Sequence, residues 1–167
     1  MNKRAEIRPM TAEDWESVRA IYLAGIATGQ ATFEAEAPTW ATWSNNHLPV
    51  PRLVAISNES LAGWAALSPV SARPVYAGVA EVSVYVEANV RGVGIGSLLL
   101  EALIQESERI GIWTLQASIF PENVPSVSLH NSFGFREVGR RESIAKMNGV
   151  WRDTLLFERR SAVVGTD

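Results

Sequence analysis

Apolar residues alternate with polar ones in some segments, which predicts strands, and recur every three or four residues in others, which predicts helices. Residues 6–9 predict a short first strand, and residues 11–14 have the form of a helix-capping box with Asp in place of Glu. A helix should follow, and Gly25 can end it. Its apolar face is formed by Trp15, Val18 and Tyr22.

Residues 26–38 lose this periodicity and predict an irregular loop. Thr39 is then placed to cap a short helix that carries Trp40 and Trp43, before Pro49 breaks the chain.

The rest of the chain alternates between predicted strands and helices. In order, the pattern predicts a hairpin with strands at 53–56 and 61–67, a strand at 81–86, a helix at 97–110, a strand at 114–120, a helix at 126–133 and a final hairpin turned by Asn148-Gly149. Gly111 and Gly134 are placed to end the two helices.

These elements predict an α/β fold with a mixed, mostly antiparallel sheet and helices on both faces. Strands 81–86 and 114–120 should be parallel neighbours, because a single helix connects them. Residues 1–167 predict one domain, in which residues 162–167 form a loose tail.

Composition and charge exclude several classes of protein but do not identify a function. The chain has no cysteine, which excludes a disulfide framework, a thiolate metal site and a cysteine nucleophile. The net charge of −3 does not indicate a nucleic-acid partner. No apolar run is long enough to span a membrane, and residues 5–9 do not continue the polar start of Asn2, Lys3 and Arg4 as a signal peptide would. We expect a cytoplasmic protein that acts on a small molecule or a protein.

The strand at 81–86 leads into a glycine-rich turn that opens the next helix. Glycine at 92, 94 and 96 removes side chains from the turn, so backbone N–H groups can surround an anion at the positive end of the helix. The spacing is not the G-x-G-x-x-G of dinucleotide-binding folds, and no Gly-Lys-Ser/Thr follows as in phosphate-binding loops of ATPases. A different pyrophosphate ligand is therefore indicated.

Two motifs in this order resemble the GNAT superfamily of N-acetyltransferases. The first is Arg91-x-x-Gly94-x-Gly96 after a strand, and the second is the Asn123 to Phe135 segment, with its Asn-x-x-Ser, Leu and Gly-Phe positions. The resemblance implies a single N-acetyltransferase domain over residues 1–167, with acetyl-CoA as co-substrate.

The same resemblance implies which residues bind acetyl-CoA. The arginine and the turn amides would hold the pyrophosphate, the backbone of the strand would hold the pantetheine arm, and the second segment would bind that arm from the opposite wall. These residues are Arg91, Gly92, Val93, Gly94, Gly96 and Ser97 in the turn, Val84 and Val86 in the strand, and Asn123 and Ser126 opposite.

Alternation along strand 81–86 separates two faces. Glu81, Ser83 and Tyr85 share one face, and three valines share the other. A carboxylate at Glu81 could accept a proton from an amine, directly or through water, before the amine attacks the acetyl carbon. The alternative is an ion-paired or strand-edge glutamate without a catalytic role.

The two histidines support different interpretations. His130 is placed to donate a proton to the departing CoA thiolate, or it is a packed helix residue. His47 is expected at the surface, and the two histidines lack the spacing of a metal site, so no metal is expected.

Nearly the whole chain is similar to the phosphinothricin N-acetyltransferase group, whose members acetylate the α-amino group of phosphinothricin, methionine sulfoximine and related amino acids. The segments that carry this similarity are residues 31–33, 72–76, 81–86, 125–130 and 148–153, whereas residues 34–50 match least. The similarity implies that Glu81 is the general base, His130 is usual at its position, and the substrate contacts Phe33, Arg73 and Tyr85. It also implies a homodimer with the pocket near the interface.

Three hypotheses follow. The chain is a small-amine N-acetyltransferase, or a GNAT enzyme that acetylates a protein N-terminus or lysine, or an acyl-CoA-binding module without activity. Glu81 as a general base disfavours the binding module without activity. A pocket lined by Arg73 disfavours the enzyme that acts on a protein.

Overall fold

The computed structural model describes residues 5–167 and forms a seven-stranded sheet flanked by four helices. The strands are β1 (Glu6–Pro9), β2 (Arg52–Ser57), β3 (Ser60–Pro69), β4 (Val79–Val86), β5 (Thr114–Ile119), β6 (Arg136–Met147) and β7 (Val150–Arg160). The helices are α1 (Trp15–Ala27), α2 (Trp40–Asn46), α3 (Ile95–Arg109) and α4 (Val124–Ser132). Asn2, Lys3 and Arg4 lie outside the described residues.

The sheet order is β1-β2-β3-β4-β5-β7-β6, and every neighbouring pair except β4 and β5 is antiparallel. The mixed, mostly antiparallel sheet predicted from the sequence is therefore confirmed, with α3 as the crossover between its two parallel strands. In residues 5–167 no helix is both long and apolar enough to cross a bilayer.

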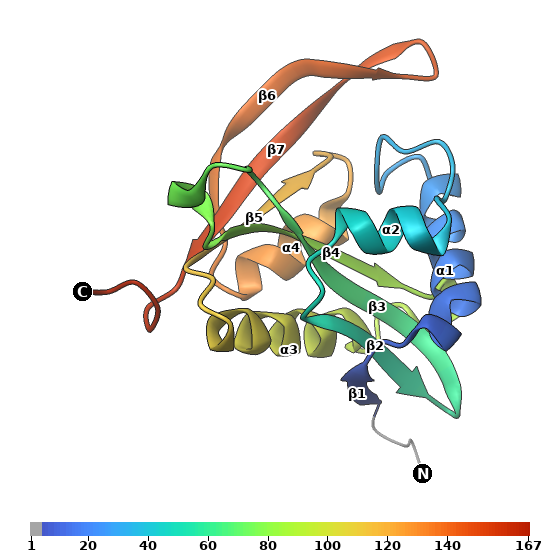
Figure 1. Cartoon of the computed structure of the whole chain (residues 1–167). Coiled ribbons are helices and arrows are strands. Elements are labelled where there is room, and N and C mark those ends of the chain that lie inside the picture. Colours follow the sequence, from blue (N-terminus) through green and yellow to red (C-terminus); the bar gives the residue numbers. More distant parts are fainter. Residues whose placement is uncertain (1–4) are drawn as a thin grey trace.

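Helices cover both faces of the sheet (Figure 1), and each face has its own core. On one face, Leu99, Leu100 and Leu103 of α3 pack against apolar residues of β2 to β5 and β7. On the other face, α1 and α2 cover an aromatic cluster that includes Trp15, Trp43, Trp64 and Tyr22. Alternation along β3 and β4 divides the strand side chains between these two cores.

The end of α1 and the start of α3 differ from the positions that the glycines predicted. Gly25 does not end α1 but lies buried inside it, where an added Cβ would meet the ring of Tyr85 at 2.8 Å. The helix ends at Ala27, and Gly29 follows with a positive φ of 68°. Helix α3 begins at Ile95, two residues before the predicted start, so Gly96 is helical.

The final hairpin is longer than its neighbours and projects from the sheet (Figure 1). Its turn residues Asn148 and Gly149 both have positive φ, as the sequence predicted for a two-residue turn. After β7, Arg160 donates hydrogen bonds to the carbonyl oxygens of Ser161, Val164 and Gly165, so part of the segment expected to be a tail is held against the domain.

Candidate active site

Strands β4 and β5 separate soon after they begin. Their register pairs run only from Val79↔Thr114 to Glu81↔Gln116, although both strands continue further. Glu87 N donates to Ala62 O of β3 at 2.8 Å, so the alternating peptide groups of Val84 and Val86 point to the other edge, toward β5. These groups have no partner in β5 and line one wall of a wedge between the two strands.

A cavity of about 1290 Å³ occupies this wedge. It is lined by β4 and β5, the 28–34 loop, the glycine-rich turn, α4 and part of β6 and β7. Of the residues expected to bind acetyl-CoA or substrate, it includes Phe33, Glu81, Val84, Tyr85, Val86, Arg91, Gly92, Gly94, Gly96, Ser97, Asn123, Ser126 and His130. Two expected residues, Arg73 and Val93, are not among its lining residues.

The glycine-rich turn has the conformation that an anion cradle requires. Gly92 and Gly94 have φ of 79° and 92°, a region that side chains with a Cβ rarely adopt. Gly94 caps α3, so the first backbone N–H groups of the helix have no partner within it. Arg91 Nε donates to Val86 O at 3.4 Å, which places this arginine beside the wedge. The turn therefore fits a pyrophosphate.

Gly96 also serves the packing of two helices, in addition to its expected place in the turn. It lies in the first turn of α3, where an added Cβ would meet Leu129 of α4 at 3.4 Å and Val86 at 3.6 Å. Its small size allows α3 and α4 to approach, while its N–H remains available at the helix start.

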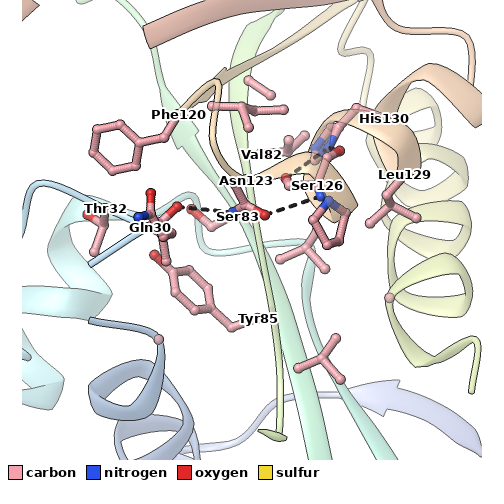
Figure 2. A pocket seen from close by; sticks show the side chains of 18 of the residues that line it. Gln30, Thr32, Val82, Ser83, Tyr85, Phe120, Asn123, Ser126, Leu129 and His130 are labelled. Atoms are coloured by element: carbon pink, nitrogen blue, oxygen red, sulfur yellow. Dashed lines mark hydrogen bonds between the residues drawn. The ribbon is translucent and has the colours of Figure 1, made fainter. Parts of the chain in front are cut away.

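The opposite wall is built on the first turn of α4 (Figure 2). Asn123 caps this helix, because its side-chain oxygen accepts a hydrogen bond from Ser126 N at 3.3 Å. Asn123 Nδ2 also donates to Gln30 O at 3.1 Å, across the cavity. The cap therefore fixes the 28–34 loop relative to α4, a bridge that sequence spacing could not reveal.

His130 is buried, and its geometry does not match the expected proton donor. Its Nδ1 donates to Ser126 O at 2.7 Å, and burial lowers the pKa of the ring. The neutral ring then carries its proton on Nδ1 and none on Nε2, which has no partner among the described residues. In this tautomer Nε2 is a hydrogen-bond acceptor, and the ring packs edge-on against Phe135 with centroids 5.0 Å apart.

Glu81 lies half-buried at the last register pair of β4 and β5. Gln116 Nε2 donates to Glu81 Oε2 at 3.4 Å, and Glu81 forms no ion pair with any residue in 5–167. Its side chain lines the large cavity and also a second cavity of about 400 Å³ beneath α2. A carboxylate at this junction faces the space where an amine could meet a thioester.

The second cavity is aromatic and acidic. Trp43, Trp64 and Tyr85 form its walls together with Glu34 and Glu36 of the preceding loop. The rings of Trp64 and Tyr85 stack with centroids 4.7 Å apart, and burial raises the pKa of the Tyr85 hydroxyl. The sequence predicted a short helix that carries Trp40 and Trp43 but gave no sign of a cavity beside it.

His47 also lines this second cavity, which corrects the expectation of a surface residue. Its ring stacks on Trp43 with centroids 4.0 Å apart, and its Nδ1 donates to Trp43 O at 2.7 Å. Burial lowers the pKa of His47. Pro49 follows α2 and turns the chain back to β2, which keeps His47 under the helix.

A cluster around Phe120 was not anticipated from the sequence. The rings of Phe33 and Phe120 meet edge to face with centroids 4.9 Å apart, and the Arg152 guanidinium lies 4.1 Å from the Phe120 ring centroid. Arg152 also donates to Gly29 O and Gln30 Oε1, at 3.0 and 2.8 Å. The final hairpin therefore holds the 28–34 loop over the cavity.

Arg73 lies elsewhere. It is exposed in the segment before β4, with its guanidinium 5.4 Å from the Tyr76 ring centroid, and it lines neither cavity. Among residues 5–167 no group of three or more His, Asp or Glu side chains could hold a metal ion.

Comparisons with known proteins agree with this arrangement. A family model described as the acetyltransferase (GNAT) family matches residues 12–135. Phosphinothricin N-acetyltransferase of Streptomyces coelicolor is 32% identical over 162 residues, which cover 92% of this chain and 95% of that protein.

Two solved structures have the same fold. A GNAT superfamily phosphinothricin acetyltransferase from Sinorhizobium meliloti, in complex with acetyl-CoA, has a TM-score of 0.88 at 27% identity and covers 98% of this chain and 91% of that chain. Ribosomal-protein-alanine N-acetyltransferase from Brucella melitensis has a TM-score of 0.86 at 30% identity and covers 93% of this chain and 99% of that chain.

Proposed function

The chain belongs to the acetyltransferase (GNAT) family, and from this premise we propose that it transfers the acetyl group of acetyl-CoA to the α-amino group of a small amino acid or analogue. Phosphinothricin, methionine sulfoximine and methionine sulfone represent this substrate class. The position of Glu81 carries the proposal, because this carboxylate lies where the acetyl-CoA wedge meets a second, smaller cavity.

Acetyl-CoA fits the wedge by the features of its walls. The turn at 91–97 would hold the pyrophosphate through backbone N–H groups and Arg91. The peptide groups of Val84 and Val86 that β5 leaves unpaired would bind the amide groups of the pantetheine arm. Asn123 and Ser126 stand on the opposite side of the arm. These contacts orient the thioester toward Glu81.

In the transfer step, the amine of the acceptor attacks the carbonyl carbon of the thioester, a C–N bond forms and the C–S bond breaks. CoA leaves as the thiolate, and the proton lost by the amine passes to Glu81, directly or through one water. Gln116 donates a hydrogen bond to the Glu81 carboxylate and holds it at this junction. His130, with Nε2 unprotonated, is not required as the acid for a good leaving group such as a thiolate.

The alternatives are acetylation of a protein N-terminus or lysine, and acyl-CoA binding without catalysis. The bridge from Asn123 to Gln30 and the packing of Phe33 on Phe120 enclose the acceptor side of the cavity, which favours a small substrate over a peptide. From the resemblance to the phosphinothricin group we further propose a cytoplasmic homodimer, which light scattering after size-exclusion chromatography would test.

The direct test is a screen for acetyl-CoA-dependent thiol release with free amino acids and their phosphinate, sulfoximine and sulfone analogues, with short peptides that carry a free N-terminus as the comparison. We expect turnover with the amino-acid analogues. Turnover with the peptides alone would establish the second alternative, and acetyl-CoA binding without turnover of any amine would establish the third.

A further inference from the structure

The large cavity is lined by an arginine, Arg141, that the resemblance did not indicate. Arg91 and Arg141 are the only Arg or Lys side chains among the described residues that line the large cavity. Arg91 lies at the glycine-rich turn, where it serves the pyrophosphate, so Arg141 of β6 is the arginine left for the acceptor. Arg73, the residue expected to bind an anion, is outside the cavity.

The register of the sheet places Arg141 on the same face as Glu81. Arg141 pairs with Thr154 of β7, and Glu158, four residues further along that strand, pairs with Gln116 of β5. Directly paired residues share a face, and so do residues two and four apart in a strand. Gln116 in turn hydrogen-bonds Glu81. Arg141 therefore extends over the face of the sheet that presents the general base.

A bulge in β6 fixes the backbone next to Arg141. The register shifts between Arg141 and Ala145, and Ser143 within this shift has a φ of 47°. The Asp153 carboxylate accepts hydrogen bonds from Arg140 Nε and from Ser143 N, each at 2.7 Å. Such bulges redirect side chains beside binding sites.

The two adjacent arginines differ in their partners. The Arg140 side chain is paired with Asp153. The Arg141 side chain is exposed and forms no hydrogen bond or ion pair within residues 5–167. The charged residues that share the cavity with Arg141 are otherwise carboxylates, apart from Arg91: Glu34, Glu81 and Glu122. An acceptor with one amine and one anionic group is thus directed with its amine toward Glu81 and its anion toward Arg141.

We propose that Arg141 is a specificity-determining residue that binds the anionic group of the acceptor, a carboxylate or a phosphinate. The guanidinium suits either group, because its paired N–H donors match two oxygens at once. Phe33 and Phe120 line the same cavity, so part of its wall is apolar. This assignment rests on the proposed function and narrows its substrate class.

The test compares Arg141→Ala and Arg141→Lys with Arg73→Ala, which removes the rival arginine, and with Arg19→Ala as the matched control. Arg19 is an exposed arginine of α1 outside both cavities. Three acceptors separate the anions: phosphinothricin has a carboxylate and a phosphinate, methionine sulfone has the carboxylate only, and methionine sulfone amide has neither. KM and kcat are measured for each, together with Kd by calorimetry in the presence of CoA.

We expect Arg141→Ala to raise KM and Kd by about tenfold or more for the anion-bearing acceptors, with little change in kcat or in acetyl-CoA binding. Lysine should restore part of the loss. A loss for phosphinothricin alone identifies the phosphinate as the bound group, whereas a loss for phosphinothricin and the sulfone, but not for the amide, identifies the carboxylate.

Equal effects on all three acceptors, no effect, or a loss that follows Arg73→Ala instead would overturn the assignment. The proposed function fails separately. Binding of the acceptors without acetylation contradicts the transferase proposal while the Kd values still test Arg141, and absence of any acceptor binding contradicts both.

Discussion

Gln116 donates a hydrogen bond to Glu81 across the last register pair that joins β4 and β5, with 3.4 Å between Nε2 and Oε2. The contact ties the carboxylate to the point where the strands begin to separate. Beyond it, the backbone of β4 has no strand partner on that edge, and the cavity begins. The proposed base and the proposed acetyl-CoA groove are therefore positioned by the separation of the same two strands.

Glu81→Gln tests the base directly. Glutamine preserves the shape and the polarity of the side chain but cannot accept the proton, so we expect kcat at pH 7 to fall by about 10² or more. The loss should shrink at high pH, where more of the amine is already neutral. Steady-state kinetics from pH 6 to pH 10 with a confirmed acceptor measure this effect.

Glu16→Gln on α1 is the control for the loss of one carboxylate, because Glu16 is exposed and lines neither cavity. Thermal stabilisation by acetyl-CoA should be the same in both variants and the wild type. A kcat close to wild type in Glu81→Gln, with chemistry shown to be rate-limiting, would assign Glu81 a structural role.

Gly94→Val tests the anion cradle. Gly94 has a φ of 92°, and an added Cβ would meet no protein atom within 4 Å, so the space beside it is available to a ligand oxygen. The wild type should gain about 2.7 kcal/mol of stability at a hundredfold excess of acetyl-CoA over its Kd, and the variant should gain much less.

Gly111→Val is a closely matched control at the other end of α3. Its φ is 88° and its surroundings are equally open, so both variants carry similar backbone strain. We expect both to lower the melting temperature without ligand, but only Gly94→Val to lose the acetyl-CoA shift. Equal shifts in the two variants would refute the cradle.

Asn123→Ala removes a helix cap and the bridge to Gln30 O together. Thr39→Ala removes a cap of the same kind from α2, where the Thr39 side chain accepts from Thr42 N, without touching the large cavity. Each should cost about 1 kcal/mol of stability by chemical denaturation. Only Asn123→Ala should also raise KM for both co-substrates, and equal KM values in the two variants would show that the bridge has no part in binding.

The free energy of unfolding should fall between pH 7 and pH 5. Burial lowers the folded-state pKa of His47 and His130 below the usual 6.5, so the unfolded chain binds more protons in this range. The stability that these neutral rings provide is complete above pH 6.5 and is lost progressively as the pH falls toward their folded-state pKa values.

Urea denaturation of the double variant His47→Gln with His130→Gln measures this contribution. Two aspartates also have pKa values below the usual 3.8: Asp14 beside Arg8, and Asp153 beside Ser143 N and Arg140. The stability that they contribute is lost only at a pH below this range. The pH 5 to 7 slope should therefore flatten in the double variant, and an unchanged slope would show that other groups produce it.

Local sequence signals predicted most of the fold. The alternation in β4, the cap at Thr39 and the Asn148-Gly149 turn each depend on a few neighbouring residues, and the structure has all three. Helix ends were less predictable, because Gly25 serves close packing against Tyr85 and not termination, a role that depends on a residue 60 positions away in the chain.

The candidate site was predictable where it follows the chain and not where it crosses the sheet. The turn at 91–97 is local, and the sequence indicated it. Asn123 was expected on the opposite wall of the cavity, but its part as the cap of α4 was not predicted. Arg141 reaches the cavity only through the register of β6 with β7, and a bulge makes that register impossible to count from the sequence. Arg73 shows the reverse case, because proximity to β4 in the chain does not bring it to the cavity.

The brief pairing of β4 with β5 also has a mechanical consequence. Within residues 5–167, the first four strands are paired with the last three only at Val79, Ala80 and Glu81, next to the hydrogen bonds that Gly78 O accepts from Trp113 N and Thr114 N. The sheet therefore consists of two plates with a short seam. Bending at this seam breaks few hydrogen bonds, and a ligand bound to both strands supplies connections that the backbone lacks. Acetyl-CoA binding should therefore stiffen the relative motion of the plates and slow amide hydrogen exchange along β4 and β5 together.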